Sequence, residues 1–599
     1  MTTSASKSEN TSTRGSAIVS DSRQSLLTSL APYVIVAILS VLIVAVVYHF
    51  WKIDWRVPLN TDPDAHQQQA IVKNFVEGGH FYVNPSLGAP GQQELYDFPL
   101  PHWTHLIVWD VLRLFSHNYG VVLNLYFFLT YPLCALTGLY ALRRFGISTG
   151  LAIAGAVLFA FSPFHTLRSE SHIFLSSLYT LPLAAMVCVW LAVGNPLFGF
   201  QLSDQMPSRP PITKDGVIAL ASCVLMGWDH PYYAFFTAGF LLIGGLLGQF
   251  RYEHRRTLIT ALLMCAVVAA ALFTALLPNI LYFHTQGRVA VGQRLPEESE
   301  RYPLTIVQLI APIQTHRVPF LNHIRQFYDQ RAEMVNENST ATLGFLGSVG
   351  LFVSLASLFR KRSSEFLYSL GILNLWALLV GIMGGFGALF AFLVSPQVRA
   401  YNRISVFIAF FSTAALIWTI DCWMRSRQSE SQFMGLLIIP SLLLTIGILD
   451  QVPDHSRIPR SIVEAEFNQQ GAFISRIDNL LPPHSMIFQL PYACYPECGG
   501  VNRMEQDSHL VGYLHSSNLR WSYGAMHFRP TDRWQERVAA EPPDQMVQSL
   551  ADAGFAGIYI DRYGYADNGA ALETQLRKLL KSEPITDSRG RYLFFRLNR

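Results

Sequence analysis

Apolar runs of about twenty residues recur along this chain, and they constrain its fold more than any other feature. Folded as a helix, such a run crosses the roughly 30 Å of hydrocarbon in a bilayer. We expect spans at residues 30–50, 119–142, 149–163, 172–194, 215–229, 232–250, 257–278, 341–359, 366–385, 404–424 and 433–450. Of the 599 residues, 51% are hydrophobic and only 14% charged, which is unusual for a soluble protein. The sequence therefore predicts a polytopic α-helical membrane protein with about 11 transmembrane helices.

Basic residues beside the spans predict the orientation of the chain. These residues are Arg14, Arg23, Arg143, Arg144, Arg251, Arg255, Arg256, Arg360, Lys361, Arg362, Arg425 and Arg427. With the spans above, all of them fall on one side, which the positive-inside rule identifies as cytoplasmic. The N-terminus is then cytoplasmic and the C-terminal segment lies outside. In a bacterium with two membranes, this places the protein in the inner (plasma) membrane with its C-terminal segment in the periplasm.

Composition divides the chain into three parts. Residues 1–24 are polar and rich in Ser and Thr, so we expect a disordered cytoplasmic tail and no cleaved signal peptide. Residues 25–452 carry the spans, with outer loops at 51–118 and 279–340. Residues 453–599 have the mixed composition of a small periplasmic α/β domain, of ordinary domain size.

Shorter patterns predict single elements within these parts. Residues 103–115 are too short and too charged to span, and indicate a helix in the membrane interface. Residues 384–394 are glycine-rich and apolar, which favours a short re-entrant or surface helix. In the C-terminal domain we expect strands at 486–490, 557–561 and 592–597, and helices at 544–553 and 570–580.

The cysteines fall into two groups. Five lie in the spans, namely Cys134, Cys188, Cys223, Cys265 and Cys422, where they act as small buried hydrophobes. Cys494 and Cys498 lie in a polar segment, separated by three residues. In an oxidising compartment this spacing predicts a local disulfide. A redox motif usually has the spacing C-x-x-C, and a zinc site would need more ligands than the neighbourhood supplies.

Two aspartates follow the first span directly and precede a short helical pattern at 65–77. Asp62 and Asp64 are one residue apart, and Gly78 and Gly79 end the pattern. A carboxylate at the membrane surface can act as a general base toward an acceptor hydroxyl. Two carboxylates can also hold a divalent cation such as Mg²⁺ or Mn²⁺. The alternative is structural, with one aspartate capping the helix and the other stabilised by its dipole.

Other polar residues are expected at the same outer surface, where they could bind an anionic or hydroxyl-bearing ligand. They are Arg168, His172, Asp229, His230, Arg399 and Arg403. Arginine binds phosphate through paired hydrogen bonds. Arg399 and Arg403 are predicted on the outer side of the membrane, where the positive-inside rule makes basic residues less common, and this favours a functional role. The alternatives are a solvated hairpin with an Arg168–Glu170 pair, an aromatic belt around Tyr232 and Tyr233, and arginines reaching lipid headgroups. Arg288, Arg294 and Arg301 in the 279–340 loop are weaker candidates.

The stretch from Asp64 to Trp103 resembles a known family of membrane enzymes. Asp64, the helix after it, Glu77 with Gly79, and the turn Phe98-Pro99-Leu100 resemble the first outer loop of GT-C-type glycosyltransferases. Those enzymes take sugars from polyprenyl-phosphate donors, and an acidic residue that opens this helix is their catalytic base. The resemblance therefore implies that Asp64 is the base, and that the polar residues above hold the phosphate or the sugar of the donor. Two positions depart from the pattern: Ala65 and His80 stand where acids are common, and Asp62 could replace the missing acid. The motifs Leu87–Pro90 and Trp228–Tyr233 look closer to a bacterial, YfhO-like branch.

The sequence thus predicts a membrane glycosyltransferase that passes a hexose or pentose from a polyprenyl-phosphate donor to an extracytoplasmic acceptor. The formal charge of +3, without a basic stripe, argues against nucleic acid as a partner. One alternative is a flippase or transporter of lipid-linked sugars, which would need ionisable residues near the middle of the membrane, where the spans carry almost none. The other is a non-catalytic scaffold for envelope assembly.

Overall fold

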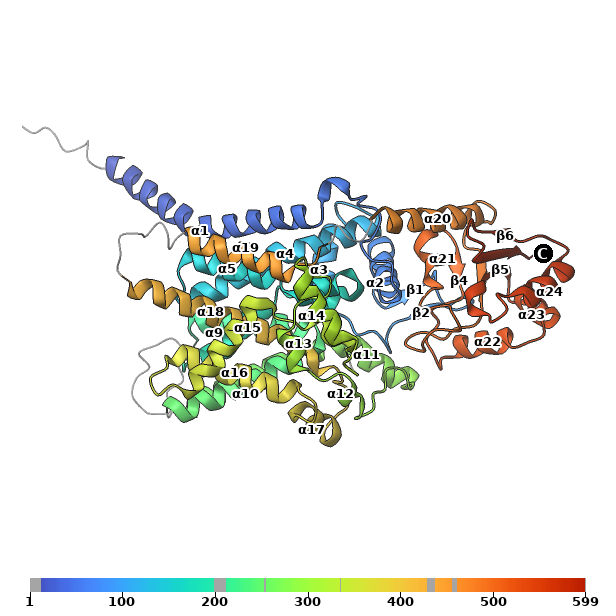
Figure 1. Cartoon of the computed structure of the whole chain (residues 1–599). Coiled ribbons are helices and arrows are strands. Elements are labelled where there is room, and N and C mark those ends of the chain that lie inside the picture. Colours follow the sequence, from blue (N-terminus) through green and yellow to red (C-terminus); the bar gives the residue numbers. More distant parts are fainter. Residues whose placement is uncertain are drawn as a thin grey trace, which may run out of the picture.

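The computed structural model describes residues 12–198, 212–252, 255–333, 335–427, 437–454 and 460–597, with the side chains of residues 12–28 excepted. Figure 1 shows a bundle of helices, a small sheet beyond one end of the bundle, and the outer-loop helix α2 between the two. Residues 1–11 of the tail and 433–436 of the last predicted span lie outside the described residues.

A helix is present at each predicted span. The helices are α1 (Ser12–Val47), α4 (Tyr119–Arg144), α5 (Thr149–Ala160), α8 (Leu181–Ala192), α9 (Lys214–Trp228), α10 (Pro231–Tyr252), α11 (Arg255–Gln286), α15 (Gly344–Ala356), α16 (Glu365–Gly381), α18 (Ser405–Ser426) and α19 (Ile439–Gln451). Within the part of the chain that the structure describes, seven helical segments are long and apolar enough to cross a membrane. The others, α9, α15, α16 and α19, have 13 to 17 residues. The polytopic helical prediction is supported, and the count of eleven stays a prediction.

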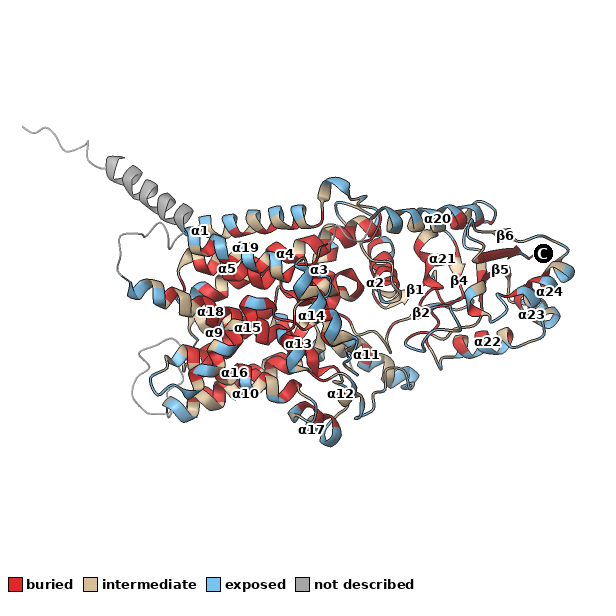
Figure 2. Cartoon of the chain, in the orientation of Figure 1, coloured by how far each residue is buried: buried red, intermediate tan, exposed pale blue. Residues whose placement is uncertain are grey.

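The bundle has a buried centre and an outer helix. In α1 only 17% of the apolar window is buried, whereas 89% is buried in the segment Glu170–Ala192. Figure 2 shows this contrast as pale outer faces on α1 and red ribbon inside the bundle. The helix α1 begins at Ser12, so it extends into the segment that the sequence analysis expects to be disordered.

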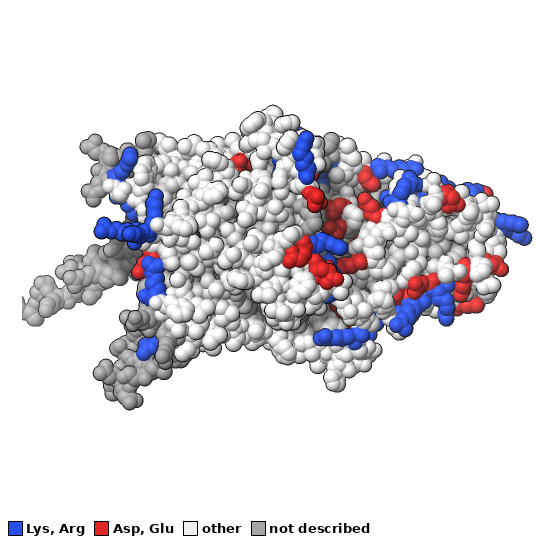
Figure 3. Space-filling view, turned by 60° about the horizontal axis from the view of Figure 1, so that its bottom comes forward, with Lys and Arg blue, Asp and Glu red and all other residues white. Residues whose placement is uncertain are grey.

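Charge separates the two ends of the bundle. Figure 3 shows Lys and Arg gathered at the end away from the sheet, and bundle sides that are almost free of charge. Pairs such as Arg251 with Glu365 and Arg425 with Asp421 belong to that basic end. This separation agrees with the positive-inside pattern on which the predicted orientation rests.

Short helices cover the end of the bundle that faces the sheet. The first outer loop folds into η1 (Phe50–Lys52), α2 (Pro63–Lys73), η2 (Asn74–Gly78) and α3 (Trp103–Leu112), with the hairpin β1 (Val83–Asn84) and β2 (Gln93–Glu94). Later segments add α6 (Pro163–Arg168), η3 (Glu170–His172), α7 (Ile173–Ser176), α12 (Glu298–Arg301), α13 (Ile306–Ile310), α14 (Pro319–Asp329), η4 (Asn336–Thr340), α17 (Phe386–Leu393) and η6 (Tyr401–Ile404). The short helix η5 (Ser357–Phe359) follows α15 at the other, basic end of the bundle. The helices predicted at 65–77 and 103–115 and the short one at 384–394 are therefore present.

The C-terminal part contains a mixed five-stranded sheet of order β4-β3-β5-β7-β6. Its strands are β3 (Met486–Leu490), β4 (Arg520–Trp521), β5 (Phe555–Asp561), β6 (Ile585–Thr586) and β7 (Tyr592–Arg596). The strand β3 is parallel to β4 and β5, and β7 is antiparallel to β5 and β6. The helices of this part are α20 (Arg460–Asp478), α21 (Leu510–His515), α22 (Pro530–Ala539), α23 (Pro543–Asp552), α24 (Ala570–Leu580) and η9 (Arg562–Gly564). The three predicted strands and two predicted helices are present.

The first outer loop is joined to the edge of this sheet. The amides of Gly88 and Ala89 donate to the carbonyls of Tyr523 and Trp521 at 2.9 and 3.0 Å, and Trp521 donates back to Ser86 at 2.8 Å. An edge strand offers unpaired backbone groups of this kind, and the loop covers them here. The motif Leu87–Pro90 therefore contacts the C-terminal part.

Gly88 is the position in this junction that a side chain would disturb. Its φ is +75°, and a Cβ atom there would lie 2.7 Å from the Gln92 carbonyl carbon. We expect Gly88→Ala to lower the free energy of unfolding by more than about 2 kcal/mol, since a left-handed φ alone costs about 1–2 kcal/mol. Gly146→Ala is the matched control, because Gly146 has a φ of +78° and no described atom within 4 Å of its Cβ position. If thermal unfolding in detergent showed equal losses of stability in the two variants, the predicted clash at Gly88 would be contradicted.

Candidate active site

A cavity of about 1400 Å³ lies between the end of the bundle and the C-terminal part. Its wall comes from segments far apart in the sequence, most of them in the predicted outer regions and some at the outer ends of predicted spans, such as Phe174, Tyr232 and Leu276. The polar and charged residues that line it include Asp64, Gln67, Asp97, His102, Ser171, His172, His230, Arg288, Arg294, Glu297, Glu298, Arg301, Glu337, Arg399, Arg403, Glu497 and Gln506. Five of the main sequence-predicted site residues are in this set, namely Asp64, His172, His230, Arg399 and Arg403, and so are the weaker candidates Arg288, Arg294 and Arg301.

Asp62 and Asp64 have different roles at the start of α2. Asp62 caps the helix: its Oδ1 accepts from the amide of Ala65 at 3.1 Å, and its Oδ2 accepts from the Ser171 hydroxyl at 2.5 Å. Asp64 lies in the first turn with its side chain 61% exposed, facing the cavity. The structure thus assigns the cap to Asp62 and leaves the Asp64 carboxylate accessible to a bound molecule.

The surroundings of Asp64 favour a proton acceptor. Its Oδ2 lies 3.5 Å from Nε2 of His172. Burial inside the cavity raises the pKa of Asp64, and the negative charges of Asp62 and Glu337 raise it further. A carboxylate with a raised pKa accepts a proton more readily than an ordinary surface aspartate.

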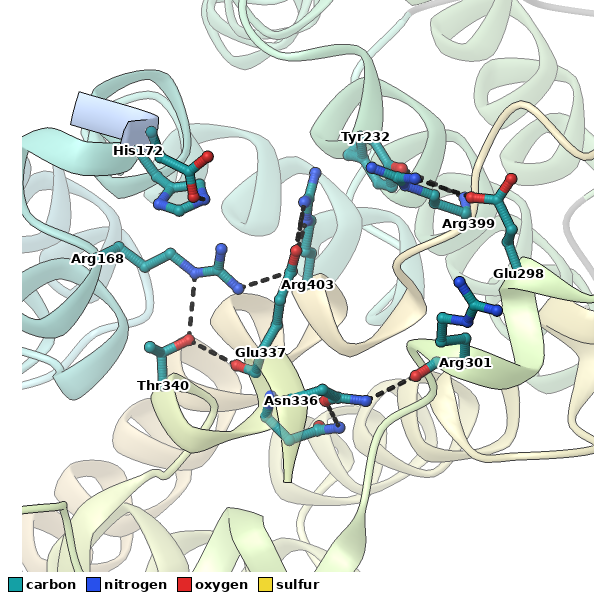
Figure 4. A network of polar contacts seen from close by, with 12 residues as sticks. Arg168, His172, Tyr232, Glu298, Arg301, Asn336, Glu337, Thr340, Arg399 and Arg403 are labelled. Carbon is teal, nitrogen blue, oxygen red and sulfur yellow. Dashed lines mark hydrogen bonds and ion pairs between the residues drawn. The ribbon is translucent and has the colours of Figure 1, made fainter. Parts of the chain in front are cut away.

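A buried ion-pair cluster forms another part of the wall, and Figure 4 shows its members pointing toward one another. Glu337 lies between Arg168, whose Nη2 is 2.8 Å from its Oε2, and Arg403, whose Nη2 is 3.1 Å from its Oε1. Arg168 also donates to Thr340 at 3.1 Å. Burial alone would raise the pKa of Glu337, but Arg403 and Arg168 hold it well below its usual range. With two guanidinium groups and one carboxylate, the cluster has a net charge of one positive unit.

Arg168 belongs to this cluster and does not form the surface pair with Glu170 that was the alternative to a ligand-binding role. The Arg168 side chain is only 3% exposed and does not line the cavity, whereas Arg403 and Glu337 do. Glu170 is also buried, and it accepts from the amide of Leu59 at 2.7 Å. The segment between the third and fourth spans is therefore an interior one, in which Arg168 supports the cavity wall from behind.

A second group of ion pairs brings the C-terminal part to the cavity. Glu497 lies 2.6 Å from Arg294 and 3.4 Å from Arg399, and Arg399 is also 2.8 Å from Glu298. Glu497 belongs to the short loop closed by the disulfide Cys494–Cys498, which confirms the predicted disulfide. Carboxylates thus neutralise part of the positive charge here.

Asp229 does not face the cavity, although the adjacent His230 does. Asp229 is 1% exposed, and its carboxylate accepts from Nε2 of His105 at 2.9 Å and from the Thr180 hydroxyl. Its backbone carbonyl accepts from Nδ1 of His102 at 3.3 Å. Asp229 is therefore placed to hold histidines in position, and its contact with a donor stays a prediction.

A divalent cation at Asp62 and Asp64 lacks further ligands among the described residues. Both oxygens of Asp62 already accept hydrogen bonds from the protein. Within the described ranges, the only group of three or more His, Cys, Asp or Glu side chains close enough to share a metal is Cys494, Cys498 and His527, and its two cysteines form the disulfide. The residues present do not make a cation site at the aspartates, so we derive no step through a metal.

Comparison with known proteins gives distant structural matches only. No protein-family model matches the chain, and no curated protein matches it in sequence. The apo oligosaccharyltransferase of Archaeoglobus fulgidus is 11% identical with a TM-score of 0.42, over 88% of this chain and 69% of that one. The same organism's oligosaccharyltransferase AglB, solved with an inhibitory peptide and a dolichol-phosphate, is 13% identical with a TM-score of 0.44, over 95% and 74%.

A third match is the arabinofuranosyltransferase AftD from mycobacteria. It is 15% identical with a TM-score of 0.47, over 95% of this chain and 41% of that one. All three matched proteins are glycosyltransferases by name. At these identities and TM-scores, the assignment of a reaction to this chain depends on the residues of its own cavity. Closeness to the YfhO-like branch stays a prediction.

Among the cavity residues that sequence reasoning missed, Glu337, Glu497 and His102 make contacts that define the site. Glu337 is one of six acids in the 279–340 loop, and nothing in its neighbourhood separates it from the others. Glu497 lies between the two cysteines, so the disulfide could have drawn attention to it. His102 follows the turn Phe98–Pro101 directly, and its position beside that turn was the available signal.

Proposed function

We propose that this chain is a membrane glycosyltransferase of GT-C type. It moves a hexose or pentose from a polyprenyl-phosphate donor to an acceptor hydroxyl on the outer face of a membrane. In a bacterium with two membranes, that face is the periplasmic side of the inner membrane, and the acceptor is an envelope glycan, lipid or protein. The observation that carries the proposal is that an accessible carboxylate, Asp64, and the arginines Arg399 and Arg403 line one cavity at the end of an apolar helix bundle.

The chemistry divides between these groups. Asp64 takes the proton from the acceptor hydroxyl while the acceptor oxygen forms a bond to the anomeric carbon of the sugar. The bond between that carbon and the phosphate oxygen breaks, and the polyprenyl phosphate leaves with the electron pair. Negative charge grows on the leaving phosphate, and fixed guanidinium groups in a site partly screened from water stabilise it.

The position of the arginines suits a donor held by lipid. Arg403 lies in η6, just before α18, and its guanidinium lies 4.5 Å from the centre of the Tyr232 ring at the start of α10. A polyprenyl chain remains among the apolar helices while its phosphate reaches the ends of those helices. The arginines at those ends are therefore where the phosphate of such a donor would arrive.

A transfer assay tests this function directly. Purified protein is mixed with farnesyl phosphates that carry labelled hexoses or pentoses, with membrane extract as acceptor, in the presence and absence of EDTA. We expect labelled acceptor to accumulate with at least one donor and to be abolished by heat-unfolding of the protein. Loss of transfer in EDTA would show a metal requirement. Absence of transfer from every donor would reject the enzyme and favour a flippase or a scaffold.

A further inference from the structure

Two histidine rings lie stacked in the wall of the cavity. His102 comes from the outer loop just before α3, and His230 comes from the turn between α9 and α10. Their ring centroids are 4.8 Å apart and their planes differ by 17°. Both residues line the cavity that contains Asp64. Two imidazole rings from distant segments thus lie side by side in the cavity wall, where a bound molecule can contact them.

Backbone hydrogen bonds fix which nitrogen of each ring carries the hydrogen. Nδ1 of His102 faces the carbonyl oxygen of Asp229 at 3.3 Å, and a carbonyl only accepts, so this Nδ1 must donate. The amide of Tyr232 donates to Nδ1 of His230 at 3.2 Å, so that Nδ1 must accept. In neutral rings, the two Nε2 atoms then have opposite hydrogen-bonding roles: Nε2 of His102 accepts, and Nε2 of His230 donates.

The surroundings keep both rings neutral. Burial, together with neighbouring His105, lowers the pKa of His102 to about 3. Burial also lowers the pKa of His230, and neighbouring His102 and the positive charge of Arg403 act in the same direction. Neither Nε2 has a hydrogen-bond partner among the described residues. One unsatisfied acceptor and one unsatisfied donor therefore remain at the cavity.

The chemistry of this pair selects hydroxyl groups and disfavours phosphate. A phosphate oxygen accepts hydrogen bonds, so it can use Nε2–H of His230 but meets a lone pair on Nε2 of His102. A hydroxyl both donates and accepts, so hydroxyl groups can satisfy both nitrogens. Phe174, whose ring lies 4.2 Å from that of His102, adds an apolar surface of the kind that covers the C–H face of a sugar.

We propose that His102 and His230 form a sugar subsite that binds neighbouring hydroxyl groups of the transferred sugar, separate from the arginines that bind its phosphate. The proposal rests on the proposed function and specifies which part of the donor lies where. Asp229 and His105 are positioning residues for this subsite, since the fixed Asp229 carbonyl orients His102.

The test is an equilibrium binding measurement, so it does not depend on turnover. The probes are farnesyl phosphate and farnesyl phosphates that carry a hexose or a pentose, and the observable is the affinity added by the sugar. We expect a sugar that strengthens binding to wild type by about tenfold or more, corresponding to one or two hydrogen bonds. His102→Phe keeps the ring stack but removes the acceptor, and should reduce this gain to nearly nothing while leaving farnesyl phosphate affinity unchanged.

Control variants separate this subsite from general damage. His117→Phe changes an exposed histidine of the same outer loop and should keep the full gain. His102→Gln can still accept a hydrogen bond and should restore part of the gain if His102→Phe lowers folding stability. An unchanged sugar gain in His102→Phe, or no gain with any sugar in wild type, would overturn the subsite. If wild type transfers sugar but His102→Phe keeps the full gain in affinity from the sugar, the subsite is rejected and the proposed enzyme is not. If the gain is lost in His102→Phe but wild type transfers no sugar, the proposed enzyme is rejected and the subsite is not.

Discussion

Asp64→Asn is expected to lower the rate of sugar transfer by about a thousandfold. The amide has nearly the size of the carboxylate but cannot take the proton from the acceptor hydroxyl. Folding should be preserved, because the Asp64 side chain is 61% exposed and the helix cap belongs to Asp62. The transfer assay measures the loss of initial rate, and thermal unfolding in detergent measures whether the variant is as stable as wild type.

A carboxylate outside the cavity provides the control for this prediction. Asp110 is on α3, 51% exposed and paired with Arg113 at 3.0 Å, and Asp110→Asn should transfer at nearly the wild-type rate. The pH profile gives an independent check. Burial raises the pKa of Asp64, with Asp62 and Glu337 acting in the same direction, so the rate should fall with decreasing pH at a midpoint above that of an ordinary aspartate. A normal rate in Asp64→Asn would exclude Asp64 as the base.

Glu337→Gln is expected to destabilise the protein by about 3 kcal/mol, the scale at which a buried ion pair loses one partner. Glutamine leaves Arg168 and Arg403 close together without the carboxylate that separates them. Glu333→Gln is the matched control, since Glu333 is an exposed acid in the same loop and should change stability by less than about 0.5 kcal/mol. Equal unfolding midpoints for the two variants in detergent would contradict a structural role for the cluster.

The pH dependence of this effect follows from the sign of the pKa shift. Burial would raise the pKa of Glu337, but the two arginines lower it overall. A carboxylate with a lowered pKa stabilises the folded state at every pH above the pKa of an unfolded glutamate, and this contribution is lost only as pH falls toward the lower folded-state value. The difference in stability between wild type and Glu337→Gln should therefore persist from neutral to mildly acidic pH and shrink only in stronger acid.

Local patterns predict the elements that depend on local properties. The spans follow from the length of apolar runs, and β3 and α24 were predicted with the bounds that the structure has. The strands β4 and β6 have two residues each, too few for an alternating pattern, and they exist because longer neighbours pair with them. The helix α20 was missed although Phe473, Ile474 and Ile477 form a buried apolar face, a pattern that favours a helix.

Most of the cavity, in contrast, depends on contacts between distant segments and not on local sequence patterns. The place of Asp64 in the cavity could be anticipated because the residues around it form a recognisable local pattern, whereas its role as the base stays a prediction. The cluster of Arg168, Glu337 and Arg403 unites segments more than sixty residues apart in the sequence, so only tertiary structure brings them together. The tautomers of His102 and His230 depend on backbone groups of Asp229 and Tyr232, which no sequence pattern describes.

The contact of Glu497 with Arg294 and Arg399 has a consequence for how this chain can be divided. Glu497 and Gln506 belong to the C-terminal part and yet form part of the cavity wall. The segment 86–89 likewise completes the edge of a sheet that lies more than four hundred residues later in the chain. A truncation near residue 452 would open the cavity and uncover that sheet edge at once, so the C-terminal part is not an exchangeable module. Chimaeras between chains of this kind would need to exchange the outer loop, the arginine-bearing segments and the C-terminal part together.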